Sequence, residues 1–461
     1  MEESMEAERT ANAYLGRDPI PKLLARFSVP CVLSMLVSAL YNIVDQIFIG
    51  QGVGYLGNAA TNVVYPFTVL ALALALMVGD GSAALLSLSL GRGDHETAHR
   101  SIGCGIVLTL AVSVVLTAAG FLWEDAILDA FGVTDACRGY ARDYMGAILV
   151  GIPFYMFTSA LNGAIRADGS PRYSMLATAA GAVLNLILDP VAIFVLGWGV
   201  WGAAVATVVG QVVTAVLSVL YLRRPRSFRF RRDSFRLRWR VVKTVLQLGV
   251  SSFIIQIAIV VVMAVANNLI GVYGPASPYG ADIPLSVIGI VMKVFAIVIA
   301  FAVGIAVGGQ PIAGYNFGAG NYRRVMETYR CILLANVAVG VVATALFELC
   351  PQVIIRLFGS ESDLYNQYAV LCFRIFLCGI LLTCIQKASS IFLQSIGKPV
   401  KSTVLSLARD VLFFVPALLI LAPRTGVTGM LWAAPIADVL ALLVTVALIA
   451  TEFRTLRAQA A

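Results

Sequence analysis

Long apolar segments alternate with short polar segments along almost the whole chain. Each apolar segment can form a helix of roughly 20 residues, the length that crosses the hydrocarbon core of a bilayer. Six of them lie at 23–50, 59–90, 101–123, 139–161, 172–197 and 199–222. Six more follow at 241–270, 283–311, 328–350, 366–392, 402–422 and 427–451. The pattern predicts an all-α membrane protein with twelve transmembrane helices.

Composition agrees with lipid as the main solvent. Hydrophobic residues make up 59% and charged residues 13% of the chain, and the mean hydropathy is +0.88. Soluble domains carry roughly 45–50% apolar and about 25% charged residues, and no soluble fold of this size hides so much apolar surface. The net charge of +8 does not indicate nucleic-acid binding, because much of it comes from one stretch between apolar segments, Arg223–Arg240.

Cysteines and the N-terminus add little to this picture. The eight cysteines contain no CxxC pair and mostly fall within apolar runs, which indicates neither a disulfide framework nor a metal site. The polar, acidic stretch Met1–Asp18 lacks the features of a cleavable signal peptide. We expect no cofactor.

Lysine and arginine are concentrated in alternate loops, which predicts the orientation. One set of loops carries Arg9, Arg17, Lys22, Arg26, Arg92, Arg100, Arg166, Arg172, the 223–240 cluster, Arg323, Arg324, Arg330, Lys398, Lys401, Arg454 and Arg457. The other set carries few, such as Arg138, Arg356 and Arg424. Positive residues stay on the cytoplasmic side, so both termini and the central linker are expected to be cytoplasmic.

The two halves of the chain repeat each other. Ser89–Arg100 resembles Tyr315–Arg330, with Gly91 matching Gly318, a displacement of 227 residues (318 − 91). Phe131–Met145 resembles Phe358–Cys372 at the same displacement. We therefore divide the chain into a first lobe at 1–222, a basic linker at 223–240 and a second lobe at 241–461. Six spans per half make the repeat parallel, and two such bundles suit alternating access around a central cavity.

Acids inside apolar segments are costly and are therefore functional candidates. Asp45 has Tyr41 four residues before it, and Asp189 has Asn185 four residues before it, so each pair shares a helical face. Pro190 is expected to disturb the helix after Asp189, and Pro30 to allow a bend in the first span. Thr207 and Gln211 lie one turn apart on the sixth span. Such groups can hold a proton or bind Na⁺, although acids near helix ends can also simply reach the headgroup zone.

Several motifs together carry a family resemblance over nearly the whole chain. They are YNIVDQIFIGQGVG in the first span, LGRGD after the second, AIRADGSPRYSM before the fifth, LNLILDPVAIF in the fifth and GQPIAGYNFGAGN after the eighth. In these the chain resembles the multidrug and toxic compound extrusion (MATE) family, in its bacterial DinF-like or MepA-like branch. The resemblance implies a V-shaped fold, a place in the bacterial plasma (inner) membrane, and export of amphipathic, often cationic drugs in exchange for H⁺ or Na⁺.

The resemblance also implies which residues form the ion-coupling cluster. Matched by motif, they are Asp45, Asn185, Asp189 and Thr207, with Tyr41 and Tyr144 beside them and Pro30 at the bend of the first helix. The same four residues would be the ligands of a bound Na⁺. We expect Gln211, Asn267 and Lys293 to support or line the substrate cavity.

Some positions depart from the family pattern or stay open. Asp80, in MVGDGSA, stands where relatives are uncharged; it either titrates or, as we favour, marks a wet cytoplasmic vestibule. Lys293 either faces the cavity or pairs with an acid such as Asp410. Arg374 and Arg409 are expected to snorkel to an interface.

Two other functions remain as alternatives to drug export. A lipid or lipid-linked oligosaccharide flippase of the same superfamily would favour a cationic cavity, and a non-transporting scaffold would show no alternating access. An enzyme is not expected, because His95 and His99 lack a metalloprotease motif and GAGNYR is no P-loop. We expect a monomer with small organic cations and the bilayer as its partners.

Overall fold

The computed structural model describes residues 13–280, 282–358 and 363–460. Arg9 and the rest of the polar N-terminus lie outside these ranges, as does part of the second repeat motif at 359–362. Within the described ranges every regular element is a helix. The elements up to the linker are η1 (Ala13–Gly16), α2 (Ile20–Gly52), α3 (Tyr55–Arg92), α4 (His95–Leu122), α5 (Glu124–Ala130), α6 (Arg138–Ala167), α7 (Pro171–Pro190), η2 (Val191–Val195) and α8 (Gly199–Leu222).

The remaining helices follow the linker, which itself contains the short helix η3 (Arg232–Phe235). They are α9 (Trp239–Tyr273), α10 (Asp282–Gly318), α11 (Tyr322–Leu349), α12 (Pro351–Phe358), α13 (Asp363–Leu371), η4 (Cys372–Phe376), α14 (Ile380–Ser395), α15 (Pro399–Leu407), η5 (Ala408–Phe414), α16 (Val415–Met430) and α17 (Ala433–Ala460).

Eleven helices of the described chain are long and apolar enough to cross a membrane. A twelfth span is formed by a broken pair, Asp363–Phe376 and Ile380–Ser395, whose halves meet at 47°. The break, at residues 377–379, directly follows η4, a π-helical turn that ends at Phe376. The prediction of an all-α protein with twelve spans is confirmed.

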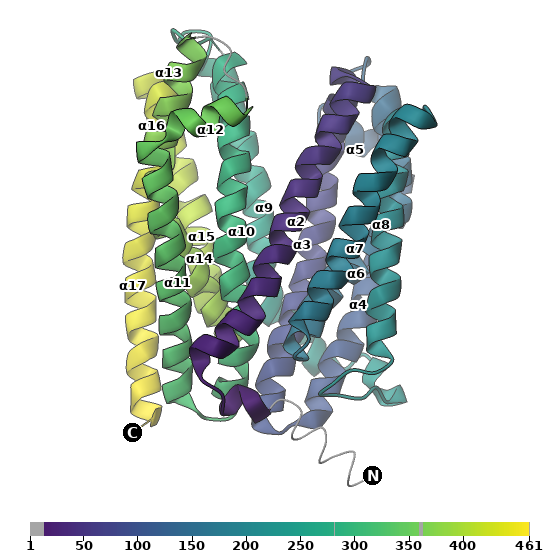
Figure 1. Ribbon diagram of the computed structural model, residues 1–461, viewed down its shortest axis with the longest axis vertical. Coiled ribbons are helices and arrows are strands. Elements are labelled where there is room, and N and C mark those ends of the chain that lie inside the picture. Colours follow the sequence, from purple (N-terminus) through teal and green to yellow (C-terminus); the bar gives the residue numbers. More distant parts are fainter. Residues whose placement is uncertain (1–12, 281, 359–362, 461) are drawn as a thin grey trace.

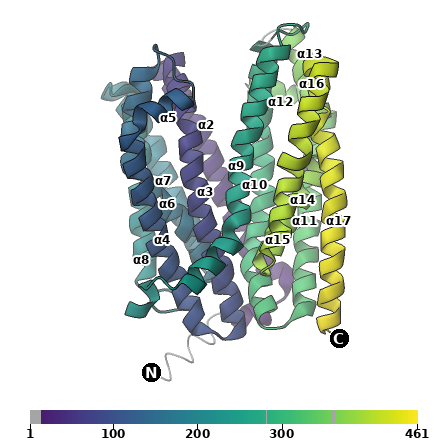
Figure 2. The same cartoon turned by 180° about the vertical axis from the view of Figure 1, so that it is seen from behind.

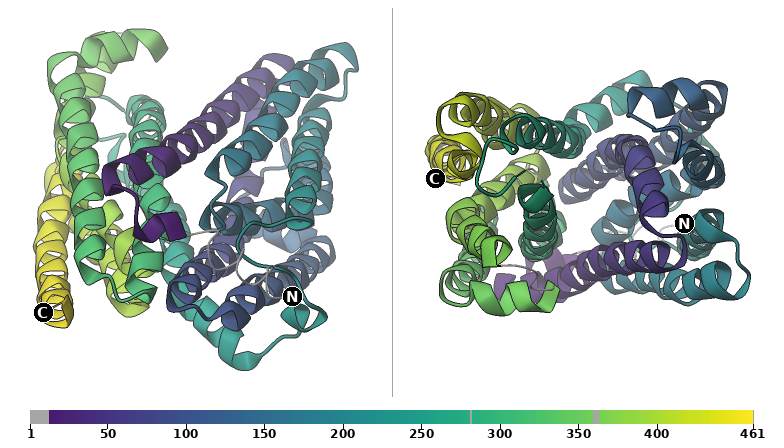
Figure 3. Two further views of the ribbon diagram at one scale, coloured as in Figure 1. Left: turned by 60° about the horizontal axis from the view of Figure 1, so that its bottom comes forward. Right: turned by 90° about the horizontal axis from the view of Figure 1, so that it is seen from above.

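The helices form two bundles that stand side by side, α2–α8 in one and α9–α17 in the other (Figures 1 and 2). We call the end of the molecule that carries η1, the linker and the C-terminus of α17 the linker end. The bundles converge at this end and diverge toward the opposite one, which we call the far end. Views along the bundles show the two groups as separate sets of helices, with α2 leaning across from one to the other (Figure 3).

The internal repeat is preserved in three dimensions. α4 and α11 both begin and end 227 residues apart, at His95 and Tyr322 and at Leu122 and Leu349. Gly199 starts α8 with a φ of 58°, and Gly426, which interrupts α16 at the matching position, has a φ of 65°. Both lie in the left-handed region that glycine adopts without strain. The two bundles are therefore pseudo-symmetric, as the repeat predicts.

α2 belongs to both bundles. Its first turns, including Leu23 and Phe27, pack in an apolar cluster with Ile332 of α11 and Ala388 of α14. Near its other end, Ile49 packs against η2 and α8. Pro30 lies between these two regions, inside a helix that runs on from Ile20 to Gly52. The far-end part of α2 is thus joined by one continuous helix to the second bundle at the linker end.

Glycines allow the two bundles to touch backbone to backbone near the linker end. A Cβ atom on Gly249 of α9 would lie 1.6 Å from the carbonyl oxygen of Met77 on α3. A Cβ on Gly308 of α10 would lie 2.5 Å from Ser28 Cα on α2, whose hydroxyl donates a 3.1 Å hydrogen bond to the Ile305 carbonyl. Small residues let membrane helices approach in this way. The structure is therefore closed at the linker end.

Asp80 takes part in this closure and does not mark an open vestibule, so our expectation for it is wrong. Its Oδ2 atom accepts a 2.8 Å hydrogen bond from Ser252 Oγ on α9 of the other bundle. Gln394 Nε2 donates in turn to Ser252 Oγ at 3.1 Å. Arg166 Nη2 lies 4.0 Å from Asp80 Oδ1, and the Asp80 side chain is 17% exposed. Asp80 thus forms an interlobe hydrogen bond that local sequence could not reveal.

We expect Asp80→Ala to weaken the closed linker end. The variant loses a hydrogen bond to a charged acceptor, worth about 1.5–3 kcal/mol. Buried Cys31 lies near Arg166 and provides a native probe. The expected result is faster maleimide modification of Cys31, read by peptide mass spectrometry, by about tenfold. Asp143→Ala, at an exposed acid on α6, is the control; equal rates in both variants would exclude a bridging role for Asp80.

The basic linker packs against α4 and is not a free tether. Ser234 Oγ lies 2.9 Å from Nδ1 of His99, whose side chain is buried. Cys104 Sγ donates to the Arg236 carbonyl oxygen at 3.2 Å. A β-carbon on Gly103 would lie 2.2 Å from the Ser234 carbonyl. His99 therefore holds the linker in place.

Candidate ion-coupling site

The candidate coupling residues come from three neighbouring helices of the first bundle. Asp45 is on the far-end half of α2, Asn185 and Asp189 are on α7, and Thr207 is on α8. α7 lies between α2 and α8 in the bundle (Figure 1), and glycines tighten its contact with α8. A Cβ on Gly181 would lie 2.6 Å from the Gly210 carbonyl oxygen. The fold thus places residues more than 100 positions apart in sequence at one site.

The backbone changes conformation immediately after Asp189. α7 ends at Pro190, and the chain continues as the π-helix η2, Val191–Val195. Proline has no backbone N–H to donate into the helix, so the regular ladder breaks at this point. Single π-helical turns in α-helices are frequent at functional sites. The expected disturbance after Asp189 is present, and Phe194 of η2 packs edge-on against Phe48 of α2, with ring centroids 6.2 Å apart.

Asn185 is the hydrogen-bonding centre of the cluster. Its Nδ2 atom donates to Asp189 Oδ1 at 3.1 Å and to Thr207 Oγ1 at 3.2 Å. Asp189 is fully buried and Asn185 is 3% exposed. The carboxyl groups of Asp45 and Asp189 lie close enough for their charges to interact. Ionised carboxylates accept hydrogen bonds but cannot donate them. A hydrogen bond between these two groups therefore requires that one of them is protonated.

Three oxygen atoms in the cluster have no hydrogen-bond partner among the described residues. They are Asp45 Oδ1, Asn185 Oδ1 and Asp189 Oδ2. Buried polar atoms are almost always paired, so a set of three at one point indicates a place for a cation. A shared proton satisfies both carboxyl groups. The same oxygens, with Thr207 Oγ1, are the hard ligands that Na⁺ also takes, so these residues fit either ion.

Two tyrosines lie near the two acids of this cluster. Tyr41 and Tyr144 both lie near enough to Asp45 and Asp189 to interact with their charges. Tyr144 also packs with Ile49 and Ile193 at the junction of α2 and η2. Gln211 lies one turn beyond Thr207 on α8, with its side chain close to Gly151 of α6. The structure thus places Tyr41 and Tyr144 beside the two acids, while the roles of both tyrosines and of Gln211 stay predictions.

The two second-bundle candidates are not part of this cluster. Asn267 is exposed on α9, and Lys293 is half-buried on α10. The suggested pairing of Lys293 with Asp410 is wrong, because Asp410 Oδ2 instead accepts from Lys387 Nζ at 2.7 Å. A role of Asn267 and Lys293 in a substrate cavity stays a prediction.

A buried network of four charges holds the second bundle together. Arg409 Nη1 contacts Asp410 Oδ1, and Arg409 Nε contacts Asp438 Oδ1, each at 2.7 Å. Thr383 Oγ1 donates to the same Asp438 oxygen at 2.9 Å. Lys387 is the fourth member of the network. Two cationic side chains, Lys387 and Arg409, thus contact the two carboxylates of Asp410 and Asp438. The expectation that Arg409 snorkels to an interface is wrong: it is 8% exposed, and its guanidinium lies over the rings of Phe295 and Phe414.

Truncating one member of this network is expected to destabilise the protein strongly. Lys387→Met leaves a buried carboxylate with one partner fewer, and breaking a buried pair costs about 3–5 kcal/mol. The midpoint of thermal unfolding in detergent should fall clearly, whereas Arg374→Met, at an exposed cation of the same bundle, should leave it nearly unchanged. In a double-mutant cycle, Lys387→Met/Asp410→Asn should recover part of the loss. Fully additive effects would contradict the coupling.

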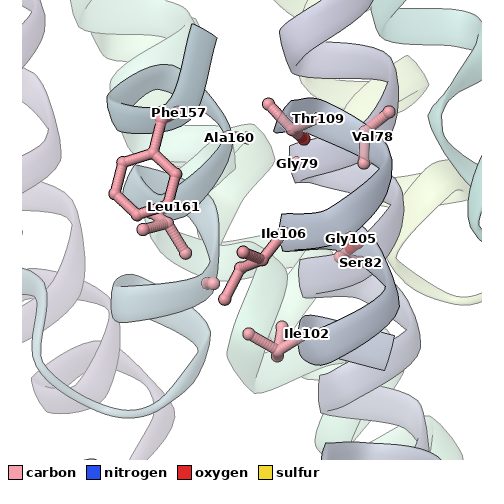
Figure 4. A pocket seen from close by; sticks show the side chains of 11 residues that line it. Val78, Gly79, Ser82, Ile102, Gly105, Ile106, Thr109, Phe157, Ala160 and Leu161 are labelled. Atoms are coloured by element: carbon pink, nitrogen blue, oxygen red, sulfur yellow. The ribbon is translucent and has the colours of Figure 1, made fainter. Parts of the chain in front are cut away.

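The small void inside the first bundle is not a substrate site. It measures about 10 Å³ and lies between α3, α4 and α6, lined by apolar groups such as Phe157 and Leu161 (Figure 4). Ser82 and Thr109 add two hydroxyl groups, neither of which has a hydrogen-bond partner among the described residues. This volume is about that of one water. An organic substrate has to bind elsewhere, outside the packed core of this bundle.

Comparison with known families identifies the fold and its class. The family model MatE matches residues 30–191 and 252–419, one segment in each bundle. The chain belongs to the MATE family. The expected family and the V-shaped fold are thereby confirmed, and the chain is a multi-span membrane protein of a transporter family.

Curated MATE relatives match over nearly full length. The multidrug export protein MepA of Staphylococcus haemolyticus is 23% identical over 430 residues, which cover 92% of each chain. MepA of Staphylococcus aureus strain MSSA476 is 22% identical over 432 residues, again 92% of each. These relatives are named as export proteins and not as enzymes, which agrees with the sequence.

Solved MATE structures superimpose closely on this one. An outward-facing multidrug resistance MATE transporter of the MOP superfamily has a TM-score of 0.89 at 24% identity, covering 96% of this chain and 98% of the other. A MATE in its bent conformation has a TM-score of 0.88 at 23% identity, covering 98% and 99%. A MOP superfamily transporter from Pyrococcus furiosus, described as having a binding pocket of reverse polarity, also has a TM-score of 0.88. At this level of identity the likeness shows the fold alone.

Proposed function

We propose that this chain is a secondary active exporter that exchanges H⁺ or Na⁺ for amphipathic, often cationic organic compounds. The observation that carries the proposal is the pair of neighbouring acids, Asp45 and Asp189, which with Asn185 contribute three unpartnered oxygens. The names of the MepA relatives support drug compounds as the substrate class. The linker end is the cytoplasmic side of the bacterial plasma membrane, in keeping with its arginines and lysines.

The coupling follows from the position of Asp45 on α2. A cation at the cluster draws α2 toward α7, because it neutralises two carboxylates that otherwise repel each other. The linker-end half of the same helix contacts Gly308 of α10 and packs into the second bundle. Binding of the ion therefore shifts the equilibrium between the conformations that are closed at one end or at the other. A substrate that binds better to the ion-free protein is exported in exchange for the ion.

An efflux assay in cells tests the transport function. Cells that lack their own drug pumps and express the chain should retain less ethidium than cells with an empty vector. Dissipating the proton and sodium gradients should remove the difference. A lipid flippase or a scaffold would leave ethidium retention unchanged, so that result would overturn the proposal.

A further inference from the structure

A basic cavity of about 350 Å³ lies at the linker end of the first bundle, apart from the carboxylate cluster. It is formed where the start of α2, the loop between α6 and α7, and the end of α8 meet the linker. Four arginines line it: Arg26, Arg172, Arg224 and Arg226. Two tyrosines, Tyr173 and Tyr221, form one wall, with ring centroids 4.9 Å apart.

Within the described ranges, no acidic side chain forms an ion pair with the four arginines of this cavity. Arg26 stacks on the ring of Tyr14 at 4.9 Å, and Arg226 Nη1 donates to the Gly169 carbonyl at 3.3 Å. The carboxyl group of Asp168, which lies beside Arg226, is already taken up by hydrogen bonds. It accepts from the Tyr221 hydroxyl at 2.5 Å, from the backbone N–H groups of Arg226 and Ser227 at 2.8 Å each, and from the Ser227 hydroxyl.

The start of α7 points a helix N-terminus and an unused hydroxyl into the same cavity. α7 runs for 20 residues from Pro171, and its N-cap residue, Ser170, makes no side-chain cap hydrogen bond. Ser170 is 5% exposed and lines the cavity, and its Oγ atom lies beside the Tyr221 hydroxyl without a hydrogen bond of normal geometry. Helix N-termini favour anions, and a buried hydroxyl without a partner points to a ligand.

Exposed apolar side chains follow two of these arginines along their helices. Val29 and Leu33 follow Arg26 on one face of α2 and are 56% and 46% exposed. Leu176 follows Arg172 by one turn on α7 and is 61% exposed. Surfaces of this kind accommodate acyl chains beside a bound headgroup. A lipid therefore fits the arrangement better than a free anion does.

We propose that this cavity is a binding site for a phosphate group, supplied by the headgroup of an anionic phospholipid in the leaflet at the linker end. Arg172 and Arg224 hold the phosphate, and the Ser170 hydroxyl and the start of α7 orient it. The site joins α2 to the linker, so an occupied site stabilises the packing of the linker end. It is separate from the proposed coupling site and does not depend on it.

Lipid retention by the purified full-length protein tests the proposal. The protein is placed in nanodiscs of phosphatidylcholine with increasing phosphatidylglycerol, and retained lipid is counted by native mass spectrometry. The double variant Arg172→Gln/Arg224→Gln should need roughly 10–30-fold more phosphatidylglycerol for half-occupancy, and Ser170→Ala about tenfold more. The matched control, Arg454→Gln/Arg457→Gln, removes the same charge at two exposed positions of the same end and should behave as the unaltered protein.

A second arm separates the two sources of phosphate. Inorganic phosphate is titrated in pure phosphatidylcholine nanodiscs, with thermal unfolding as the readout. Binding of phosphatidylglycerol that depends on Arg172 and Arg224, with no effect of millimolar phosphate, establishes the lipid. Stabilisation by phosphate that the double variant loses keeps the phosphate site but overturns the lipid as its source. Equal retention by the pocket and control variants overturns the site itself, whatever the protein exports.

Discussion

Asp189→Asn is expected to abolish gradient-driven export while leaving the protein folded. The amide keeps the size of the side chain and can still bond to Asn185, whose Nδ2 atom lies 3.1 Å from Asp189 Oδ1 in the native cluster. It removes the charge that a coupling ion neutralises. Coupling energies of 1–3 kcal/mol correspond to roughly 5–150-fold effects, so accumulation in proteoliposomes under an imposed pH or Na⁺ gradient should fall by at least about tenfold.

The control for this result is another acid of the first bundle. Asp143 is exposed on α6, and Asp143→Asn should transport normally. Substrate exchange without any gradient should persist in Asp189→Asn, because it needs no ion cycle. Full gradient-driven accumulation in the variant would show that this acid is structural.

Gly249→Ala should prevent closure of the linker end and stop the transport cycle. The added methyl group would lie 1.6 Å from the Met77 carbonyl oxygen, and backbone atoms cannot turn aside as a side chain can. Overpacking typically costs about 1–3 kcal/mol, a shift of roughly 5–150-fold in the population of the closed state. Spin labels at exposed Arg92 and Arg323, on α3 and α11, should report longer distances across the linker end.

Gly271 on the same helix provides the matched control. A Cβ at this position would meet nothing within 4 Å, so Gly271→Ala should leave both the distances and transport unchanged. If Gly249→Ala behaves in the same way, close backbone contact between α3 and α9 is not required for the closed state.

The fold could be predicted from the sequence because lipid imposes a simple length rule. Each span must satisfy its own backbone and cover about 30 Å of hydrocarbon, so apolar length alone located the helices. The parallel repeat followed from matched motifs such as those at Gly91 and Gly318. The broken span after η4 was not anticipated, because no proline marks its 47° bend in the sequence.

The buried polar contacts were harder to predict because their partners are far apart in sequence. Asp45 and Asp189 were paired only through the family resemblance. Asp80 bonds to Ser252, 172 residues away on the other bundle. Lys387 and Asp410 sit on different helices, as do Arg409 and Asp438. Considered singly, such charges look too costly for a membrane interior, and only the assembled fold neutralises them.

A cation bound at the Asp45–Asp189 pair is proposed to determine how the two bundles are oriented relative to each other. Spin labels attached through a noncanonical amino acid at 122 and 349, the exposed ends of α4 and α11, measure the separation of the bundles at the far end. We predict that the distance distribution changes on acidification, or on addition of Na⁺ at alkaline pH. Asp45→Asn/Asp189→Asn should hold the acid-state distribution at every pH. If the distance distribution of this variant changes with pH or Na⁺ as it does in the unaltered protein, the two acids do not control the orientation of the bundles.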